Sequence, residues 1–403
     1  MNETWTSPTG APQPDRPGAP SPAAPQNSAP SPYDTRGPIR HPGPPSAPMT
    51  PAEARAADKA WRRAVVDARL PREPVEYQHV LRGPANRWWK PVLSLILLLL
   101  ITVTALMSVS IVAAAALFAS GSLSAGSAGA LSDLDLNNPI VFALSMLSLA
   151  ILIPISLLVI RLAHGVPAGY LHSVAGRFRW GWAGRLTLVL LPFYIAYVGL
   201  FALLSGMTWN PNASWAILLP IVLILVPLQS AGEEYAFRGV LMQTVGSWIP
   251  HRWISLVIPG AMSVVTFALV HGSLDPWILV DLGLFAALAV YVTWRTGGLE
   301  AAVVLHALNN VLLFGANVAN GDMNMGVITE DAQGVPVHLL GSALYFTIVA
   351  VVVTVLAKRN DVQRVTTPPA LPAGGPGYAA PGHAGPTVAS AGQPADAGVP
   401  QGR

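Results

Sequence analysis

Long apolar runs separated by short polar segments fill the middle of the chain. Eight of these runs approach or exceed the roughly 18 to 20 residues that a helix needs to cross the hydrocarbon core of a bilayer. The fourth run is too long for one perpendicular crossing, so we expect it to tilt, to break near Pro220 and Pro227, or to extend past the membrane. The pattern predicts an all-α polytopic membrane protein with about eight transmembrane helices. The predicted spans are 91–118, 139–163, 187–206, 215–246, 254–272, 277–294, 298–316 and 338–357.

Lysine and arginine lie at alternate ends of these spans, whereas the loops at 121–138, 272–276 and 317–337 contain acidic residues and neither Lys nor Arg. Basic short loops stay on the cytoplasmic side of a membrane. Both termini are therefore predicted to face the cytoplasm. The basic residues are Arg82, Arg87, Lys90, Arg177, Arg179, Arg185, Arg252, Arg295, Lys358 and Arg359.

Composition agrees with a membrane protein, since 52% of the residues are hydrophobic and 11% are charged, against about 25% charged residues in an ordinary soluble domain. The chain has no cysteine, which excludes disulfides, thiol nucleophiles and thiolate metal sites. The net charge of +3 is small, and we predict the lipid bilayer, not nucleic acid, as a partner.

The two ends of the chain have a different composition from the spans. Residues 1–49 are rich in Pro and Ala and 366–403 in Pro, Gly and Ala, which predicts disordered termini. Residues 50–90 are predicted to form a basic juxtamembrane helix or linker, and 91–357 the transmembrane bundle. No apolar run that could serve as a secretory signal precedes residue 50. The composition of the termini indicates a bacterial source, and hence the bacterial plasma membrane.

The fourth span contains two carboxylates and one arginine, Glu233, Glu234 and Arg238. A charged side chain at the centre of a membrane helix costs roughly 2.5 to 3.5 kcal/mol, so such groups face the bundle interior and usually mark function. Glu234 and Arg238 are four residues apart and can pair on one helix face. Glu233 is turned about 100° from Glu234 and is predicted to be the free carboxylate.

Two later spans carry further polar residues. The fifth ends with Phe267 and His271, and the seventh carries His306 and Asn310 one turn apart. Alone, His271 is more often a packing residue than a catalyst, and Asn310 could serve helix packing. Because the topology brings these residues toward related depths, we expect them to share a polar cavity with Glu233.

This set of side chains suits peptide hydrolysis. A buried carboxylate can act as general base on water, which fits Glu233, and His306 and Asn310 can donate hydrogen bonds to an oxyanion while His271 orients the water. In this reading the site needs no cofactor. The alternative is a zinc site with Glu233, His271 and His306 as ligands and an open fourth position.

The three motifs, Glu-Glu-x-x-x-Arg at 233–238, Phe-x-x-x-His at 267–271 and His-x-x-x-Asn at 306–310, resemble in order and context the CPBP (Abi) family of intramembrane proteases. This family includes the type II CAAX prenyl endopeptidase and bacteriocin-processing or self-immunity proteins. The resemblance covers about 215–316, the predicted protease core. It implies an eight-helix fold, Glu233 as the base, His271 as its partner, and His306 and Asn310 as oxyanion donors, with Glu234, Arg238 and Phe267 in support.

We therefore predict an intramembrane endopeptidase that cleaves a peptide or protein substrate in or at the membrane. The alternatives are a non-catalytic membrane scaffold and a proton- or ion-coupled transporter, because intramembrane Glu, His and Arg also build ion pathways. We expect the two tails to be dispensable, so that a fragment of about 80–360 keeps activity.

Overall fold

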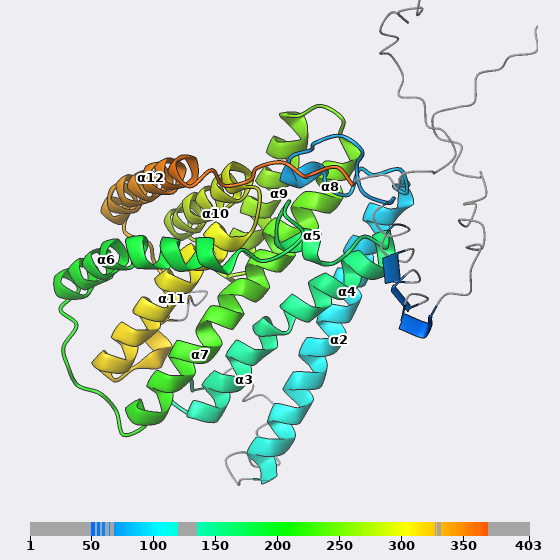
Figure 1. Ribbon diagram of the computed structural model, residues 1–403. Coiled ribbons are helices and arrows are strands. Elements are labelled where there is room, and N and C mark those ends of the chain that lie inside the picture. Colours follow the sequence, from blue (N-terminus) through cyan, green and yellow to red (C-terminus); the bar gives the residue numbers. More distant parts are fainter. Residues whose placement is uncertain are drawn as a thin grey trace, which may run out of the picture. The chain divides into compact units, whose positions relative to one another are not determined.

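The spans predicted from the apolar runs are helices in a computed structural model of the chain (Figure 1). The structure describes residues 50–52, 55–56, 59–60, 64, 68–119, 135–326, 328 and 332–369. The predicted tail at 1–49 and most of the one at 366–403 lie outside these residues, as does much of the predicted juxtamembrane helix. The described part has no strand and two isolated β-bridges, so the prediction of an all-α polytopic membrane protein is confirmed.

Seven helical segments of the described chain are long and apolar enough to cross a membrane. The second span is divided between α3 (Pro139–Ala150) and α4 (Leu152–His164), which follow each other directly. The segments are Trp89–Val112, Pro139–His164, Trp180–Leu204, Trp215–Trp248, Pro276–Thr296, Glu300–Asn320 and Pro336–Arg359.

The fifth predicted span, 254–272, is shorter than expected. It forms α9 (Ile254–Leu269), a helix of 16 residues that at 1.5 Å per residue is about 24 Å long. The helix stops because Gly272 adopts a left-handed conformation with φ of 85° and Pro276 begins the next helix. Of the predicted eight spans, seven are therefore full-length and one is short, and His271 lies beyond the end of its helix.

The long fourth run is interrupted at a different place from the two prolines that suggested a break. Pro220 and Pro227 lie inside α7 (Trp215–Glu234). A π-helix, η2 (Tyr235–Leu241), follows directly and leads into α8 (Met242–Trp248). Short π-helical segments inside longer helices are frequent at functional sites, and this one begins immediately after the two glutamates.

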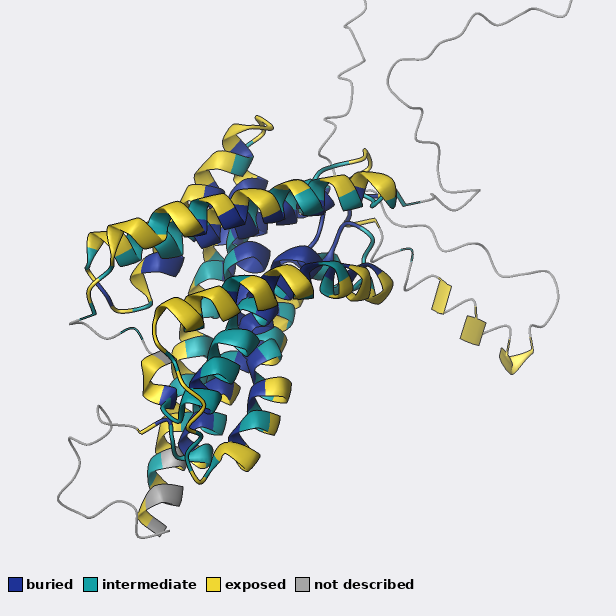
Figure 2. Cartoon of the chain, turned by 90° about the vertical axis from the view of Figure 1, so that its left-hand side faces the viewer, coloured by how far each residue is buried: buried dark blue, intermediate teal, exposed yellow. Residues whose placement is uncertain are grey.

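Helix α7 lies between α3 and α11 (Glu300–Asn320) in the bundle (Figure 1). The close approach of α3 requires a glycine, because a Cβ on Gly232 would stand 2.1 Å from the carbonyl oxygen of Leu149. Helix α6 (Trp180–Leu204) packs on α11, α10 (Pro276–Thr296) on α9 and α12 (Pro336–Arg359), and α2 (Trp89–Ala119) on α4. Buried residues follow the inner helix faces and exposed ones the outer faces (Figure 2).

Two segments outside the predicted bundle pair with each other at the helix ends. The amide of Val75 donates to Thr366 Oγ1 over 3.1 Å, and the amide of Thr366 donates to the Val75 carbonyl over 2.9 Å. Tyr77, in the short helix η1 (Tyr77–His79), is fully buried and donates its hydroxyl proton to the Leu171 carbonyl over 2.6 Å. Both segments are therefore part of the folded unit.

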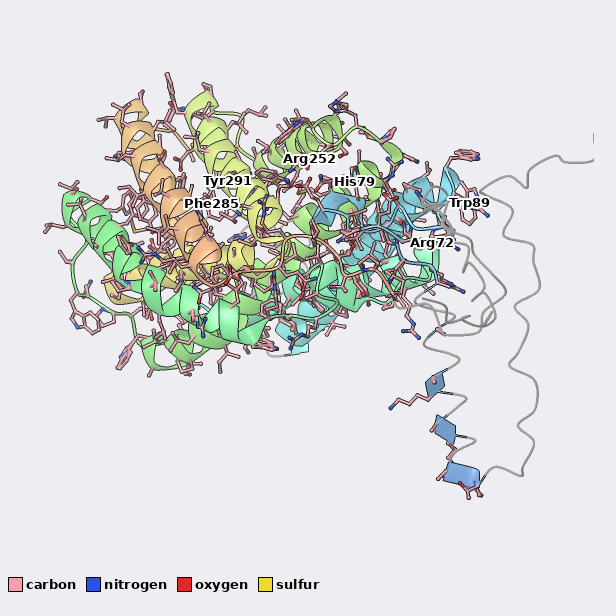
Figure 3. The ribbon with its side chains drawn as sticks, turned by 45° about the horizontal axis from the view of Figure 1, so that its top comes forward. Arg72, His79, Trp89, Arg252, Phe285 and Tyr291 are labelled. Carbon is pink, nitrogen blue, oxygen red and sulfur yellow. The ribbon has the colours of Figure 1, made fainter. Side chains whose placement is uncertain are left out.

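The first of these segments is also held by a two-bond ion pair. Arg252 donates through Nε and Nη2 to the two carboxylate oxygens of Glu76, over 3.0 and 2.7 Å. Burial raises the pKa of Glu76, but hydrogen bonds from Arg252 and Gln78 outweigh it and leave the pKa below its ordinary value. Figure 3 labels Arg252 and His79, whose ring Nε2 lies 3.0 Å from the Ile249 carbonyl oxygen.

Because Val75, Tyr77 and Thr366 make these contacts, a stable fragment should be longer than the predicted 80–360. We expect a chain of residues 80–360 to be less stable than one of 68–369 by at least about 2 kcal/mol, the contribution of one fully buried large side chain such as Tyr77. Thermal unfolding of both fragments and of the full chain in the same detergent measures this. Equal stability of the two fragments would contradict it, and 68–369 should match the full chain.

Candidate active site

The two adjacent glutamates lie at the junction of α7 and η2, inside the bundle. Glu234 and Arg238 are 0% exposed and Glu233 is 8% exposed. Arg238 Nη1 donates to Glu234 Oε1 over 3.0 Å, as the four-residue spacing predicts. The buried charge of Glu234 is thus compensated within its own helix.

Arg238 also contacts an aromatic ring from the next helix. Its guanidinium carbon lies 4.4 Å from the ring centroid of Phe267 in α9, and its Nε and Nη2 have no hydrogen-bond partner among the described residues. A guanidinium over an aromatic face is attracted by the ring quadrupole. Phe267 therefore supports the Glu234–Arg238 pair from the neighbouring helix.

His306, from the second turn of α11, contacts both glutamates. Its Nδ1 lies 2.8 Å from Glu234 Oε1, and its Nε2 lies 3.7 Å from Glu233 Oε2. The ring is flanked by Phe267 and Phe285, with centroids at 5.8 and 5.1 Å. Because Nδ1–H donates a hydrogen bond to Glu234, Nε2 of the neutral ring is an acceptor, and it is the ring nitrogen near Glu233.

Gln229, which the sequence analysis did not single out, connects Glu233 to Asn310. Its Nε2 donates to Glu233 Oε1 over 2.6 Å, and its Oε1 accepts from Asn310 Nδ2 over 3.3 Å and from Ser230 Oγ over 3.2 Å. The sequence does indicate this contact, because Gln229 lies one helical turn before Glu233 and on the same helix face. Among the described residues Glu233 forms no salt bridge with a Lys or Arg, and only its Oε2 lacks a hydrogen bond.

Asn310 and His271 occupy different surroundings. Asn310 Oδ1 accepts a hydrogen bond from Asn309 Nδ2 over 3.1 Å, which fixes the amide next to Gln229. His271 is half-buried, and its Nδ1 lies 2.7 Å from the Phe267 carbonyl oxygen. Among the described residues, no hydrogen bond or ion pair joins His271 to Glu233, His306 or Asn310. The structure thus brings together Glu233, Glu234, Arg238, His306 and Asn310, and places His271 beside Phe267.

The zinc alternative requires three ligands in one place. Glu233 Oε2 and His306 Nε2 face each other, but no three His, Asp or Glu side chains of the described chain are arranged so that they could hold a metal ion.

The chain matches one protein-family model. Residues 212–312 match the model for the Rce1-like type II CAAX prenyl endopeptidases, a segment that contains all the predicted site residues. This match confirms the resemblance predicted from the three motifs. A Bacillus subtilis (strain 168) protein, uncharacterized protein YyaK, is 36% identical over 107 residues, and the alignment spans 25% of this chain and 35% of YyaK. No solved structure matches the chain.

Proposed function

We propose that this multi-pass membrane protein is an intramembrane endopeptidase that hydrolyses a peptide bond in a membrane-associated peptide or protein. We place it in a bacterial plasma membrane with both termini in the cytoplasm, as the loop charges indicate. One observation carries the proposal. Among the described residues Glu233 Oε2 is buried without a hydrogen-bond partner, and it lies 3.7 Å from His306 Nε2, so that two acceptors are close enough to share one water molecule.

Two such acceptors can hold and activate one water molecule, because water donates two hydrogen bonds. In the proposed step Glu233 takes one proton from the water, and the water oxygen forms a bond to the carbonyl carbon of the substrate. The carbonyl becomes an oxyanion. When the C–N bond breaks, the proton passes from Glu233 to the leaving nitrogen, and the carboxylate is regenerated.

The remaining side chains position and stabilise this reaction. Glu234 accepts a hydrogen bond from Nδ1–H of His306 and so orients the ring, as the carboxylate does in other carboxylate–histidine pairs. Nε2 of His306 is then an acceptor for the water, a different role from that of the oxyanion donor implied by the family resemblance. Asn310 has a second amide hydrogen beyond the one given to Gln229, and we assign it to the oxyanion. His271, which the resemblance implies as the partner of Glu233, forms no hydrogen bond to this group among the described residues, so we assign it no step in the reaction.

The proposal is tested with the full chain in detergent and a library of membrane-associated peptides, with products identified by mass spectrometry. We expect the wild-type protein to cleave equally with and without a chelator, and Glu233→Ala to cleave nothing. Activity that a chelator removes would overturn the metal-free mechanism and assign the site to a metal. Unchanged cleavage by both Glu233→Ala and Glu234→Ala would overturn the protease assignment.

A further inference from the structure

A short segment of the chain connects the start of α11 with the residue that follows Glu234. It consists of α5 (Gly169–His172), labelled in Figure 1, and the loop that leads to Arg179 directly before α6, and we call it the α5 segment. The amide of Leu299, immediately before α11, donates to the His172 carbonyl over 2.8 Å. The backbone of the α5 segment is therefore bonded directly to the start of α11.

A buried ion pair fastens the same segment to the first turn of α11. Arg179 donates through Nε and Nη2 to the two carboxylate oxygens of Glu300, over 2.8 and 2.6 Å. Glu300 is 0% exposed, and the ion pair requires a glycine nearby, because a Cβ on Gly298 would stand 2.5 Å from Arg179 Nη2. The remaining Nη1 donates to the Thr296 and Gln363 carbonyls, over 3.0 and 2.9 Å. Each guanidinium nitrogen of Arg179 is thus bonded, and the side chain fixes the start of the helix that carries the site histidine.

The α5 segment also contacts the π-helix. His172 Nδ1 and the Tyr235 hydroxyl form a hydrogen bond, and the two rings meet edge to face with centroids 5.4 Å apart. Tyr235 is 4% exposed and is the first residue of η2, directly after Glu234. Further along η2, a Cβ on Gly239 would stand 3.1 Å from a side-chain carbon of Leu171. The α5 segment therefore packs closely on η2 as well as on α11.

We propose that Arg179 and Tyr235 are positioning residues that keep Glu234 and His306 at hydrogen-bond distance. Glu234 and His306 belong to different helices, and their 2.8 Å hydrogen bond forms only if η2 and α11 keep their relative depth and rotation. Arg179 fixes α11 to the α5 segment, and Tyr235 fixes η2 to the same segment. The proposal rests on the proposed function, in which this hydrogen bond orients the ring that holds the water. A misplacement of about 1 Å can cost about 100-fold in rate.

Two conservative substitutions test the proposal in the full chain. Tyr235→Phe removes only the hydroxyl that bonds His172. Arg179→Lys keeps the positive charge beside the buried Glu300 but cannot form the two-bond fork, whereas Arg179→Gln would leave that carboxylate unpaired. We expect each conservative variant to lower kcat by about 10- to 100-fold with KM changed less than about twofold. Cleavage of a peptide identified from the library measures both constants.

The matched controls make the same chemical changes away from the site. Tyr291→Phe removes a hydroxyl that is hydrogen-bonded to Thr354 Oγ1 between α10 and α12. Arg252→Lys removes the two-bond fork to Glu76. Both should keep kcat within about twofold of the wild type, because distant sites act independently. Losses as large as those of the two test variants would overturn the proposal, since kcat would then respond to any loosened contact of the bundle.

The background Glu234→Gln separates positioning from a general structural role. If Arg179 and Tyr235 act through the Glu234–His306 pair, a chain that already lacks the Glu234 carboxylate has little left for them to position. In this background Tyr235→Phe and Arg179→Lys should each lower kcat by less than about a further twofold. The same fractional loss in both backgrounds would overturn the proposal.

A measurement without substrate distinguishes this proposal from the proposed function. In protein containing isotope-labelled histidine, the nuclear magnetic resonance signals of the His306 ring, assigned with His306→Gln, show which nitrogen carries the proton. We expect Nδ1 in the wild type, and a mixture of Nδ1 and Nε2 in Tyr235→Phe and in Arg179→Lys. Unchanged His306 signals in both variants would overturn the positioning role. Altered signals would support that role even where the protease assignment fails.

Discussion

Glu233→Gln should lower kcat by about 10²- to 10⁴-fold, the usual contribution of a general base, with little change in stability. The substitution removes the carboxylate that accepts the proton from water. It keeps the shape of the side chain and leaves an amide oxygen that can still accept the hydrogen bond from Gln229. Single-turnover cleavage of a peptide identified from the library measures the rate, and thermal unfolding measures the stability.

A second carboxylate in a membrane span serves as the control. Asp281, half-buried in α10, interacts with Ser342 and not with the Glu233 network. Asp281→Asn removes an intramembrane negative charge without touching the candidate site, so cleavage should remain within about twofold of the wild type. Equal losses from both substitutions would mean that Glu233 acts only through the charge balance of the bundle, and full activity of Glu233→Gln would exclude it as the base.

Arg238→Met should destabilise the protein by about 3 to 5 kcal/mol, the usual cost of leaving one partner of a buried ion pair without the other. Glu234 is fully buried, and Arg238 is the only described cation paired with it besides a protonated His306. Thermal or denaturant unfolding of the full chain in detergent measures the loss. A change below about 1 kcal/mol would show that the charge of Glu234 is compensated elsewhere.

The double variant Glu234→Gln/Arg238→Met separates stability from catalysis. Removing both charges should recover much of the stability, whereas activity should stay low because His306 has lost the carboxylate that holds its Nδ1 proton. Arg252→Met is the control for removing an arginine as such, since its ion pair with Glu76 is half exposed and exposed pairs contribute little. It should affect stability much less than Arg238→Met.

Several features of the protein could be predicted because they depend on one helix at a time. The length of an apolar run decides whether a helix can cross a bilayer, and seven of the eight predicted spans have that length. The helical period places Glu234 and Arg238 on one face, and their ion pair forms as predicted. The same period puts Gln229 one turn from Glu233, so their hydrogen bond was also predictable from the spacing of four residues.

Other features could not be read from any single helix. The hydrogen bond from His306 to Glu234 joins residues 72 positions apart, and that from Asn310 to Gln229 joins residues 81 apart. The hydrophobic pattern also does not predict that α9 ends early or that a π-helix follows Glu234.

The sequence by itself determined which segments cross the membrane and which polar residues they carry, because burial in lipid and helical periodicity act locally. Only the tertiary structure decided which of those residues meet. Contacts between helices depend on their relative depth and rotation, and these are set by close approaches such as that of Gly232 to Leu149. A shift of one residue along either helix moves a side chain by about 1.5 Å and turns it by about 100°, enough to separate His306 from the two glutamates.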